Sequence, residues 1–395
     1  MVGDIEGWLN RLGDDEPSID ITVVPARALE SWWGIPDEDL HRMTRIYFPR
    51  NSESLMGYDV LFFNHARLNF FTPRQLFMMV DFVGTERKVS IAWQQDVPPF
   101  TDVSSQWLYS PLSDAFPIDM EKFIYESSLG THWLWWDNKP LKLVSGRPPV
   151  FSVFESTGIF DSRIYRASRP CYAKEGATIW VYILDGPRDD PEAPAFISWR
   201  YGDSDAWCFG IHPGEADQGR IGGGDPAVMS PDDAGRWWEL IFLNICFYSI
   251  GRETLSLEEA VDKLSVKTQF SYFRDVASMS QDIIDFVSKV GANSVRAEST
   301  LSQANQVRSE AEIDYLERRY EVASEKMEDA SQLVDQAIDE AFLAKDAALL
   351  WIYISEWLVT TSTALVSGVI LWWLMVRRRL YREVTTTQLH HLKES

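Results

Sequence analysis

One stretch near the C-terminus constrains this chain more than any other. Residues 357–376 read WLVTTSTALVSGVILWWLMV, twenty residues without a charged side chain, which is long enough to cross a bilayer core as a helix. Its two ends carry residues that favour a membrane interface: Trp351, Tyr353 and Trp357 at one end, and Trp372, Trp373, Tyr381, Arg377, Arg378 and Arg379 at the other. A buried core helix, which is the alternative, rarely has both aromatic ends and a basic flank. We therefore expect one membrane span at 351–376 and a short basic tail at 377–395.

The charges beside this stretch predict its orientation. Five Lys or Arg residues follow it, whereas Lys345 is the only basic residue in the eighteen positions before residue 351. The positive-inside rule then places the C-terminal tail in the cytoplasm and the large N-terminal part outside the cell membrane. The first thirty residues contain no apolar core of a signal peptide. That orientation needs a signal upstream of this start or one already removed, and a tail-anchored protein whose domain faces the cytoplasm is the alternative.

Composition excludes several classes of partner. The net charge of −22 opposes binding to the phosphates of nucleic acid and docking of the soluble part on anionic lipid. Cys171, Cys208 and Cys246 lie far apart without a CxxC motif, so at most one disulfide is expected and no zinc cluster. The six His residues form no HxH or HExxH pattern. We therefore expect no metal and no cofactor.

A short lead-in at 1–19 precedes residues 20–252, which alternate between strand and helix patterns. Residues 59–64 form a continuous apolar run, typical of a strand buried on both faces of a parallel sheet. Thr72 and Pro73 have the residue types of a helix N-cap and first helical position. The next strand is predicted at 88–93, so this region should form a βαβ unit.

Further elements are predicted on both sides of this unit. A β-hairpin is indicated by two aromatic-rich runs around the turn sequence Gly-Asp-Ser-Asp at 202–205. The remaining predictions are strands at 21–25, 45–49, 149–154 and 177–184, and a helix at 233–250.

This order resembles the class I glutamine amidotransferase-like fold, including its ThuA-like branch associated with trehalose utilisation. The resemblance is carried by YDVLFFNHARLNFFTPRQLFMMVDFVG, by KVSIAW after it, by PAFISWRYGDSDAWCFGIHPGE, and by the closing Trp-rich helix. It covers about residues 20–250. It implies an α/β, flavodoxin-like domain with a mainly parallel sheet.

The resemblance also indicates where the catalytic residues of an amidotransferase would lie. In that family the nucleophilic Cys lies on a tight turn after the strand that matches 88–93. Residues 94–98 here read QQDVP, with neither a Cys nor the glycines of a nucleophile elbow. His212-Pro213-Gly214-Glu215 is similar to the family's His-Pro-Glu element with one extra residue. Without a thiolate to activate, amidotransferase activity is not expected.

Two sets of residues remain as candidate sites. His212, Glu215 and Asp96 are candidates for acid–base catalysis, because Asp96 follows a strand at the carboxyl end where α/β sheets bind ligands. The alternative is that His212 and Glu215 only shape the loop after the hairpin. With seventeen Trp in the chain, Trp133, Trp136 and Trp199 are candidates for stacking on a glycan. The alternative is that they are core residues.

Residues 253–350 contain no strand pattern and predict a helical stalk. One helix is expected at 269–290 with Phe273, Val276, Ile283, Phe286 and Val290 facing inward. The most regular pattern is a coiled-coil seam with alternating spacings of three and four, formed by Ile313, Leu316, Tyr320, Ala323, Met327, Ala330, Val334, Ala337, Ala341, Ala344, Ala348 and Trp351. This seam could pair with Leu301, Ala304, Val307 and Ala311 as an antiparallel hairpin, or it could associate between chains.

The seam reaches the apolar stretch without a break, so we expect the stalk and the span to be one helix. Within the span, Thr360, Ala364 and Gly368 lie four apart, a small-residue stripe suited to helix pairing in lipid. The stalk together with ALLWIYISEWLVTTSTALVSGVILWWLMVRRRLYREV resembles uncharacterised archaeal membrane proteins that join an amidotransferase-like domain to a helical stalk and a C-terminal anchor.

These observations favour a non-catalytic binding or scaffold protein held at the membrane, with the lipid bilayer, a second copy, and a protein or glycan as its partners. The alternative is a ThuA-like hydrolase or lyase that acts on a sugar-like substrate.

Overall fold

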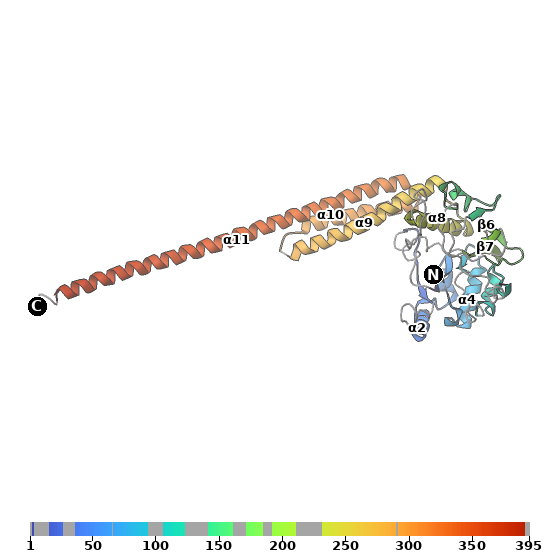
Figure 1. The fold of residues 1–395 in the computed structure, drawn as a ribbon, viewed down its shortest axis with the longest axis horizontal. Helices are drawn as coiled ribbons and strands as arrows, with labels where there is room; N and C mark the ends of the chain where they lie inside the picture. Colours follow the sequence, from blue (N-terminus) through green and yellow to red (C-terminus); the bar gives the residue numbers. More distant parts are fainter. Residues whose placement is uncertain are drawn as a thin grey trace. The chain divides into compact units, whose positions relative to one another are not determined.

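A computed structural model describes residues 2–3, 16–26, 36–64, 66–93, 106–122, 141–160, 171–184, 192–210, 231–289 and 291–391. Its fold is shown in Figure 1. The chain divides into two compact units. The first unit contains Met1–Lys267 and Tyr315–Tyr320, and the second contains Thr268–Asp314 and Glu321–Ser395.

The first unit is a mixed α/β domain built on one sheet. Its strands are β1 (Val2–Gly3), β2 (Val24–Pro25), β3 (Val60–Asn64), β4 (Val89–Trp93), β5 (Leu141–Leu143), β6 (Thr178–Leu184), β7 (Glu192–Tyr201) and β8 (Ser204–Phe209), in the spatial order β2-β1-β3-β4-β8-β7-β6-β5. The neighbouring pairs from β2 to β8 are parallel. The pairs from β8 to β5 are antiparallel. The sheet is therefore parallel in one half and antiparallel in the other.

The helical elements of this unit lie between and after the strands. They are α2 (Asp37–Tyr47), α3 (Ser52–Met56), η1 (Leu68–Phe70), α4 (Pro73–Val83), α6 (Leu112–Ala115), η3 (Ser152–Thr157) and α8 (Pro231–Ser249). The β3–α4–β4 segment is the predicted βαβ unit, and its two strands are parallel neighbours. The Thr72 side chain accepts a hydrogen bond from the Gln75 backbone N–H in a capping box, and Pro73 begins the helix.

Two predicted strands are wrong. Residues 45–47 are the last turn of α2, whose first turn carries three acidic residues that the helix dipole stabilises. Residues 152–157 form the 3₁₀ helix η3, which buries Phe154 completely. In both places residues with strand-like propensity belong to a helical turn: Ile46 and Tyr47 lie on an exposed turn, whereas Phe154 lies on a turn that faces the core.

The predicted hairpin is confirmed. Strands β7 and β8 pair antiparallel from Phe196↔Phe209 to Tyr201↔Ser204, which leaves a two-residue turn. Gly202 in this turn has a φ of +58°, and a Cβ atom there would lie 2.7 Å from the Gly84 carbonyl oxygen. Only glycine fits, because the turn needs a left-handed conformation and also a close approach to the end of α4.

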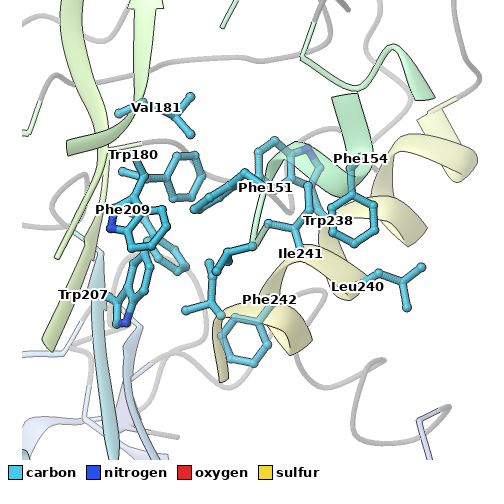
Figure 2. Close-up of a cluster of buried hydrophobic side chains, with 14 of the residues drawn as sticks. Phe151, Phe154, Trp180, Val181, Trp207, Phe209, Trp238, Leu240, Ile241 and Phe242 are labelled. Carbon is cyan, nitrogen blue, oxygen red and sulfur yellow. The ribbon is translucent and has the colours of Figure 1, made fainter. Parts of the chain in front are cut away.

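The sheet is buried on both faces. Alternate residues of each central strand point to opposite layers: Phe62, Ile91 and Trp207 join one hydrophobic cluster, and Phe63, Ala92 and Cys208 join the other. Helix α8 packs in the first cluster and α4 in the second. Figure 2 shows the first cluster, which is dominated by aromatic rings. This burial explains why strands β3 and β4 read as continuous apolar runs.

The second unit is built from three helices: α9 (Leu257–Lys289), α10 (Val295–Leu316) and α11 (Tyr320–His391), of which α9 and α11 begin in the first unit. The predicted pairing of α10 with α11 is confirmed as antiparallel. Lys326 contacts Asp314 at 2.7 Å, whereas Glu340, farther along α11, contacts Arg296 at the other end of α10 at 2.8 Å. Gln269 of α9 contacts Ser324 of α11 at 2.9 Å.

The predicted seam differs from the structure at both of its ends. Ile313 and Leu316 belong to α10 and are exposed, and α11 begins only at Tyr320, after Arg318 turns the chain with a φ of +61°. From Ala323 to Ala341 every seam residue is fully buried. At the other end, Ala344 and Ala348 are only partly buried and Trp351 is exposed. Because the seam is used within the chain, it is not available for association between chains.

Candidate functional site

Most of the predicted site residues lie outside the described residues. These are Asp96, His212, Glu215, Trp133 and Trp136. The strands that precede two of them are described: β4 ends at Trp93 and β8 ends at Phe209, and these two residues are paired neighbours in parallel strands. The carboxyl ends of β4 and β8 therefore lie side by side at the same end of the sheet.

Trp199 is the candidate stacking residue that the structure describes. It lies on β7, and its indole N–H donates a 2.8 Å hydrogen bond to the Ala115 carbonyl oxygen. The Lys174 ammonium lies 4.5 Å from the centre of its ring. One ring face and the N–H are therefore already engaged by the domain itself, which is the arrangement of a structural Trp.

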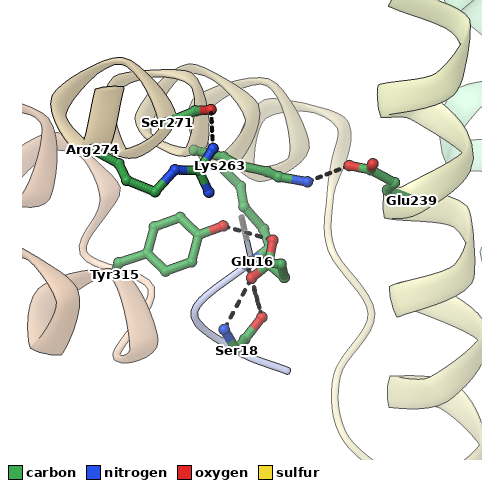
Figure 3. Close-up of polar contacts among 8 residues, drawn as sticks. Glu16, Ser18, Glu239, Lys263, Ser271, Arg274 and Tyr315 are labelled. Atoms are coloured by element: carbon green, nitrogen blue, oxygen red, sulfur yellow. Dashed lines mark hydrogen bonds and ion pairs between the residues drawn. The ribbon is translucent and has the colours of Figure 1, made fainter. Parts of the chain in front are cut away.

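A cluster of buried charges is the most unusual polar feature of the first unit (Figure 3). Glu16 and Lys263 form an ion pair at 2.8 Å, and their side chains are 1% and 2% exposed. The Tyr315 hydroxyl donates a 2.9 Å hydrogen bond to the second carboxylate oxygen of Glu16, and Ser18 donates through its backbone and side chain. The Lys263 ammonium also lies 4.0 Å from the centre of the Tyr315 ring. The carboxylate thus has partners at both oxygens.

The pKa values of the cluster follow from burial opposed by pairing. Burial alone would raise the pKa of the Glu16 carboxyl, but the charge of Lys263 and the hydrogen bonds from Lys263 and Ser18 bring this pKa below its ordinary value. Burial lowers the pKa of Lys263 despite the attraction of Glu16. Burial, together with the Glu16 charge, raises the pKa of Tyr315. Tyr315 therefore remains a neutral donor to a charged carboxylate.

Further contacts fix the turn between α10 and α11 in the same unit. Arg318 donates a 2.6 Å hydrogen bond to the Glu253 carbonyl oxygen, and it lies 5.2 Å from the ring centre of Phe247. Lys267 forms an ion pair with Glu239 of α8. Together with the cluster, these contacts join the lead-in segment, α8, the start of α9 and the 315–320 turn. We call it the buried charge cluster, defined by Glu16, Ser18, Lys263 and Tyr315.

Sequence reasoning missed this cluster. The lead-in was expected to be loose, and Lys263 was not singled out. One signal was present: Ala260, Lys263 and Lys267 follow helical spacing, and all three are buried. A lysine at a core position of a helix indicates a buried partner.

The first unit also encloses a cavity of about 170 Å³ between residues 18–22, the start of β3 and α8. Its walls include Phe62, Phe242 and Cys246, and the Tyr58 hydroxyl bonds to Thr22 at 3.0 Å. Burial raises the pKa of the Cys246 thiol, so the thiol is not a ready nucleophile. The cavity lies at the amino end of β3, opposite the edge where open α/β sheets bind ligands. Within the described part of the chain, no group of His, Cys, Asp or Glu could hold a metal ion.

Helix α11 contains a segment long and apolar enough to cross a membrane, and none of this segment is buried. Trp357, Trp372 and Trp373 are all exposed, and the Arg377 guanidinium lies 5.3 Å from the ring centre of Trp373. A shallow groove on this segment is lined by Thr361, Ala364, Leu365, Gly368, Val369 and Trp372. It includes two residues of the predicted small-residue stripe.

Comparison with known proteins adds little to this geometry. No protein-family profile matches the chain. No curated protein matches it. Similar solved structures include the cytoplasmic protein STM3548 from Salmonella typhimurium, with 13% identity and a TM-score of 0.39 over 62% of this chain and 87% of that one. Another is the cytoplasmic protein STM1381 from Salmonella typhimurium LT2, with 12% identity and a TM-score of 0.33 over 51% and 76%.

Proposed function

We propose that this chain is a membrane-anchored, non-catalytic binding or scaffold protein that carries an amidotransferase-like domain on a helical stalk. Helix α11 is the observation that carries the proposal. Its seam is buried from Ala323 to Ala341, whereas every side chain from 357 to 376 is exposed on the same continuous helix. Twenty uncharged, largely apolar residues exposed on all sides of a helix are suited to lipid and not to water.

The topology supports the domain assignment. Strands β2, β1, β3, β4 and β8 are parallel neighbours in that order, which corresponds to the 2-1-3-4-5 order of flavodoxin-like sheets. The turn sequence directly after β4, residues 94–98, contains no Cys, which favours binding over amidotransferase chemistry. The partner would be a protein or a glycan.

Membrane association of the chain should depend on the apolar segment of α11. The full chain is expected to stay in the membrane fraction after carbonate extraction, and a chain that ends at Leu350 is expected to be released. The physical reason is that the shorter chain lacks the apolar segment but keeps the buried seam up to Ala341. Immunoblots of the two fractions measure this. A full chain that carbonate extracts would contradict the anchor.

The oxidation state of the cysteines reports on which side of the membrane the first unit lies. The sulfur atoms of Cys171 and Cys208 lie 3.8 Å apart in the core of the first unit. If the domain lies outside the cytoplasm, as the positive-inside rule predicts, the pair is expected to form a disulfide, because oxidising compartments maintain such bonds. Alkylation of the denatured, unreduced chain should then label only Cys246. Labelling of all three cysteines would instead favour a domain in the cytoplasm.

A hydrolase or lyase acting on a sugar-like substrate is the second candidate. It is favoured by the adjacent ends of β4 and β8, since Asp96 and His212 each follow these strands by three residues (93 to 96 and 209 to 212). Turnover of glycosyl substrates by the purified chain, lost in both Asp96→Asn and His212→Ala, would replace the binding proposal by this one.

A further inference from the structure

Helix α9 has two apolar stripes, and the bundle of the second unit covers one of them. The covered stripe includes Phe270, Phe273, Ile284 and Val287, which are all buried. The second stripe is formed by Tyr272, Val276, Met279, Ile283 and Phe286. Sequence reasoning merged the two stripes into one inward face. The structure corrects this, because Tyr272, Met279 and Phe286 are 60%, 52% and 58% exposed.

The second stripe has the pattern of a two-stranded coiled coil. Its spacings alternate between four and three residues, which places Tyr272, Met279 and Phe286 at d positions of a heptad and Val276 and Ile283 at a positions. In parallel coiled coils, β-branched residues at a favour two strands over three or four. A stripe of this kind is self-complementary across a two-fold axis, since each residue then meets its own counterpart.

Lipid does not reach this stripe. The turn between α9 and α10, at Gly291–Asn293, lies against Ala348 and its neighbours on α11. Ala348 precedes the expected span, which begins at residue 351, by three residues, or about 5 Å of helix, and Phe286 lies about 8 Å farther back. The headgroup layer is only about 5–8 Å thick on each side of the hydrocarbon core. The stripe is therefore in water and needs a protein surface to cover it.

We propose that this stripe is the contact surface for a second copy of the same chain, packed in parallel. The proposal rests on the proposed membrane anchor, because copies anchored in one bilayer all have the same orientation. Charge supports it as well. Asp275 and Asp282 take the g positions, and the residues at the e positions that a parallel pair would bring towards them, Ser280 and Val287, are uncharged and buried in the chain's own bundle. A parallel pair therefore brings no like charge towards these aspartates.

Cysteine crosslinking tests the contact in the full chain in native membrane vesicles. Met279→Cys places a thiol next to its counterpart, so a short bis-maleimide should give a covalent dimer. Gln281→Cys is the matched control, because it is exposed on the opposite side of α9. We expect at least ten times more dimer from Met279→Cys than from Gln281→Cys. The unsubstituted chain, whose cysteines are all buried, sets the background.

A second measurement separates contact from chance collision. Met279→Glu should reduce the co-purification of two differently tagged copies at least tenfold, without changing the thermal unfolding of the chain. Equal crosslinking at positions 279 and 281 overturns the proposal, as does crosslinking from Ala364→Cys alone, which would place the contact in the span. Failure of the anchor is seen separately by carbonate extraction. If carbonate extracts the chain but Met279→Cys still crosslinks selectively, the result supports the contact between copies and contradicts the membrane anchor.

Discussion

Replacing Lys263 with Met is expected to destabilise the first unit by about 3–5 kcal/mol, because it leaves the Glu16 carboxylate buried without its cation. Both side chains are almost completely buried, and their charged atoms are 2.8 Å apart. Met is similar in length to Lys but carries no charge, so it removes the ion pair with Glu16 and the ammonium contact with the Tyr315 ring. The loss therefore measures charge more than volume. Denaturant unfolding followed by near-ultraviolet circular dichroism, which reports aromatic packing, gives the free energy.

Two controls make this prediction specific. The double change Glu16→Gln with Lys263→Met should recover much of the loss, since a buried pair replaced by neutral groups costs far less than a buried pair that is broken. Lys142 forms an exposed ion pair with Glu192, and Lys142→Met should cost no more than about 1 kcal/mol. A cost for Lys263→Met as small as that of Lys142→Met would show that the buried pair is not important for stability.

In the Lys263→Met variant, the contribution of Glu16 to stability should depend on pH in the opposite direction from that in the natural chain. In the natural chain the pKa of Glu16 is lowered. Its stabilisation is therefore present above the ordinary carboxyl pKa of about 4.3 and is lost as the pH falls through the lowered value. Without Lys263, burial raises the pKa of Glu16, so protonation favours the folded state. The variant should become more stable, relative to the natural chain, as the pH falls from 7 towards 4.

The sequence predicts best where local and tertiary preferences agree. Thr72 and Pro73 have the residue types of a helix start, and the strands on either side are buried on both faces. Residues 45–49 failed because strand-like residues there belong to a helix whose start, at Asp37, is stabilised by acidic side chains. The residue types at 45–49 favour a strand locally, and the continuation of the helix that starts at Asp37 overrides this preference.

Other features depend on contacts that sequence spacing does not contain. Glu16 and Lys263 are 247 residues apart, so no local pattern pairs them. The turn after α10 contains neither Gly nor Pro, and Arg318 adopts its left-handed conformation while held by Glu253 and Phe247. The two stripes of α9 lie on adjoining faces, and only burial in the folded bundle tells them apart.

Three of the Trp residues lie in one core cluster, and truncating one of them is expected to cause a large loss of stability. Trp180, Trp207 and Trp238 are at most 4% exposed, and Figure 2 shows them among other aromatic rings. Trp238 stacks on Phe196 with ring centres 5.5 Å apart and planes 13° apart. Trp238→Ala is expected to cost about 3–5 kcal/mol, since it leaves a large cavity between α8 and the sheet.

The control is Trp199→Phe, which removes one indole hydrogen bond but keeps a ring beside Lys174. It should cost about 1 kcal/mol. Near-ultraviolet circular dichroism during denaturant unfolding compares the two variants, and a glycan array compares their binding. If Trp238→Ala is as stable as Trp199→Phe, the aromatic cluster does not hold the domain together. If Trp199→Phe abolishes glycan binding at unchanged stability, Trp199 is a ligand contact in spite of its structural bonds, and the binding partner of the domain is a glycan.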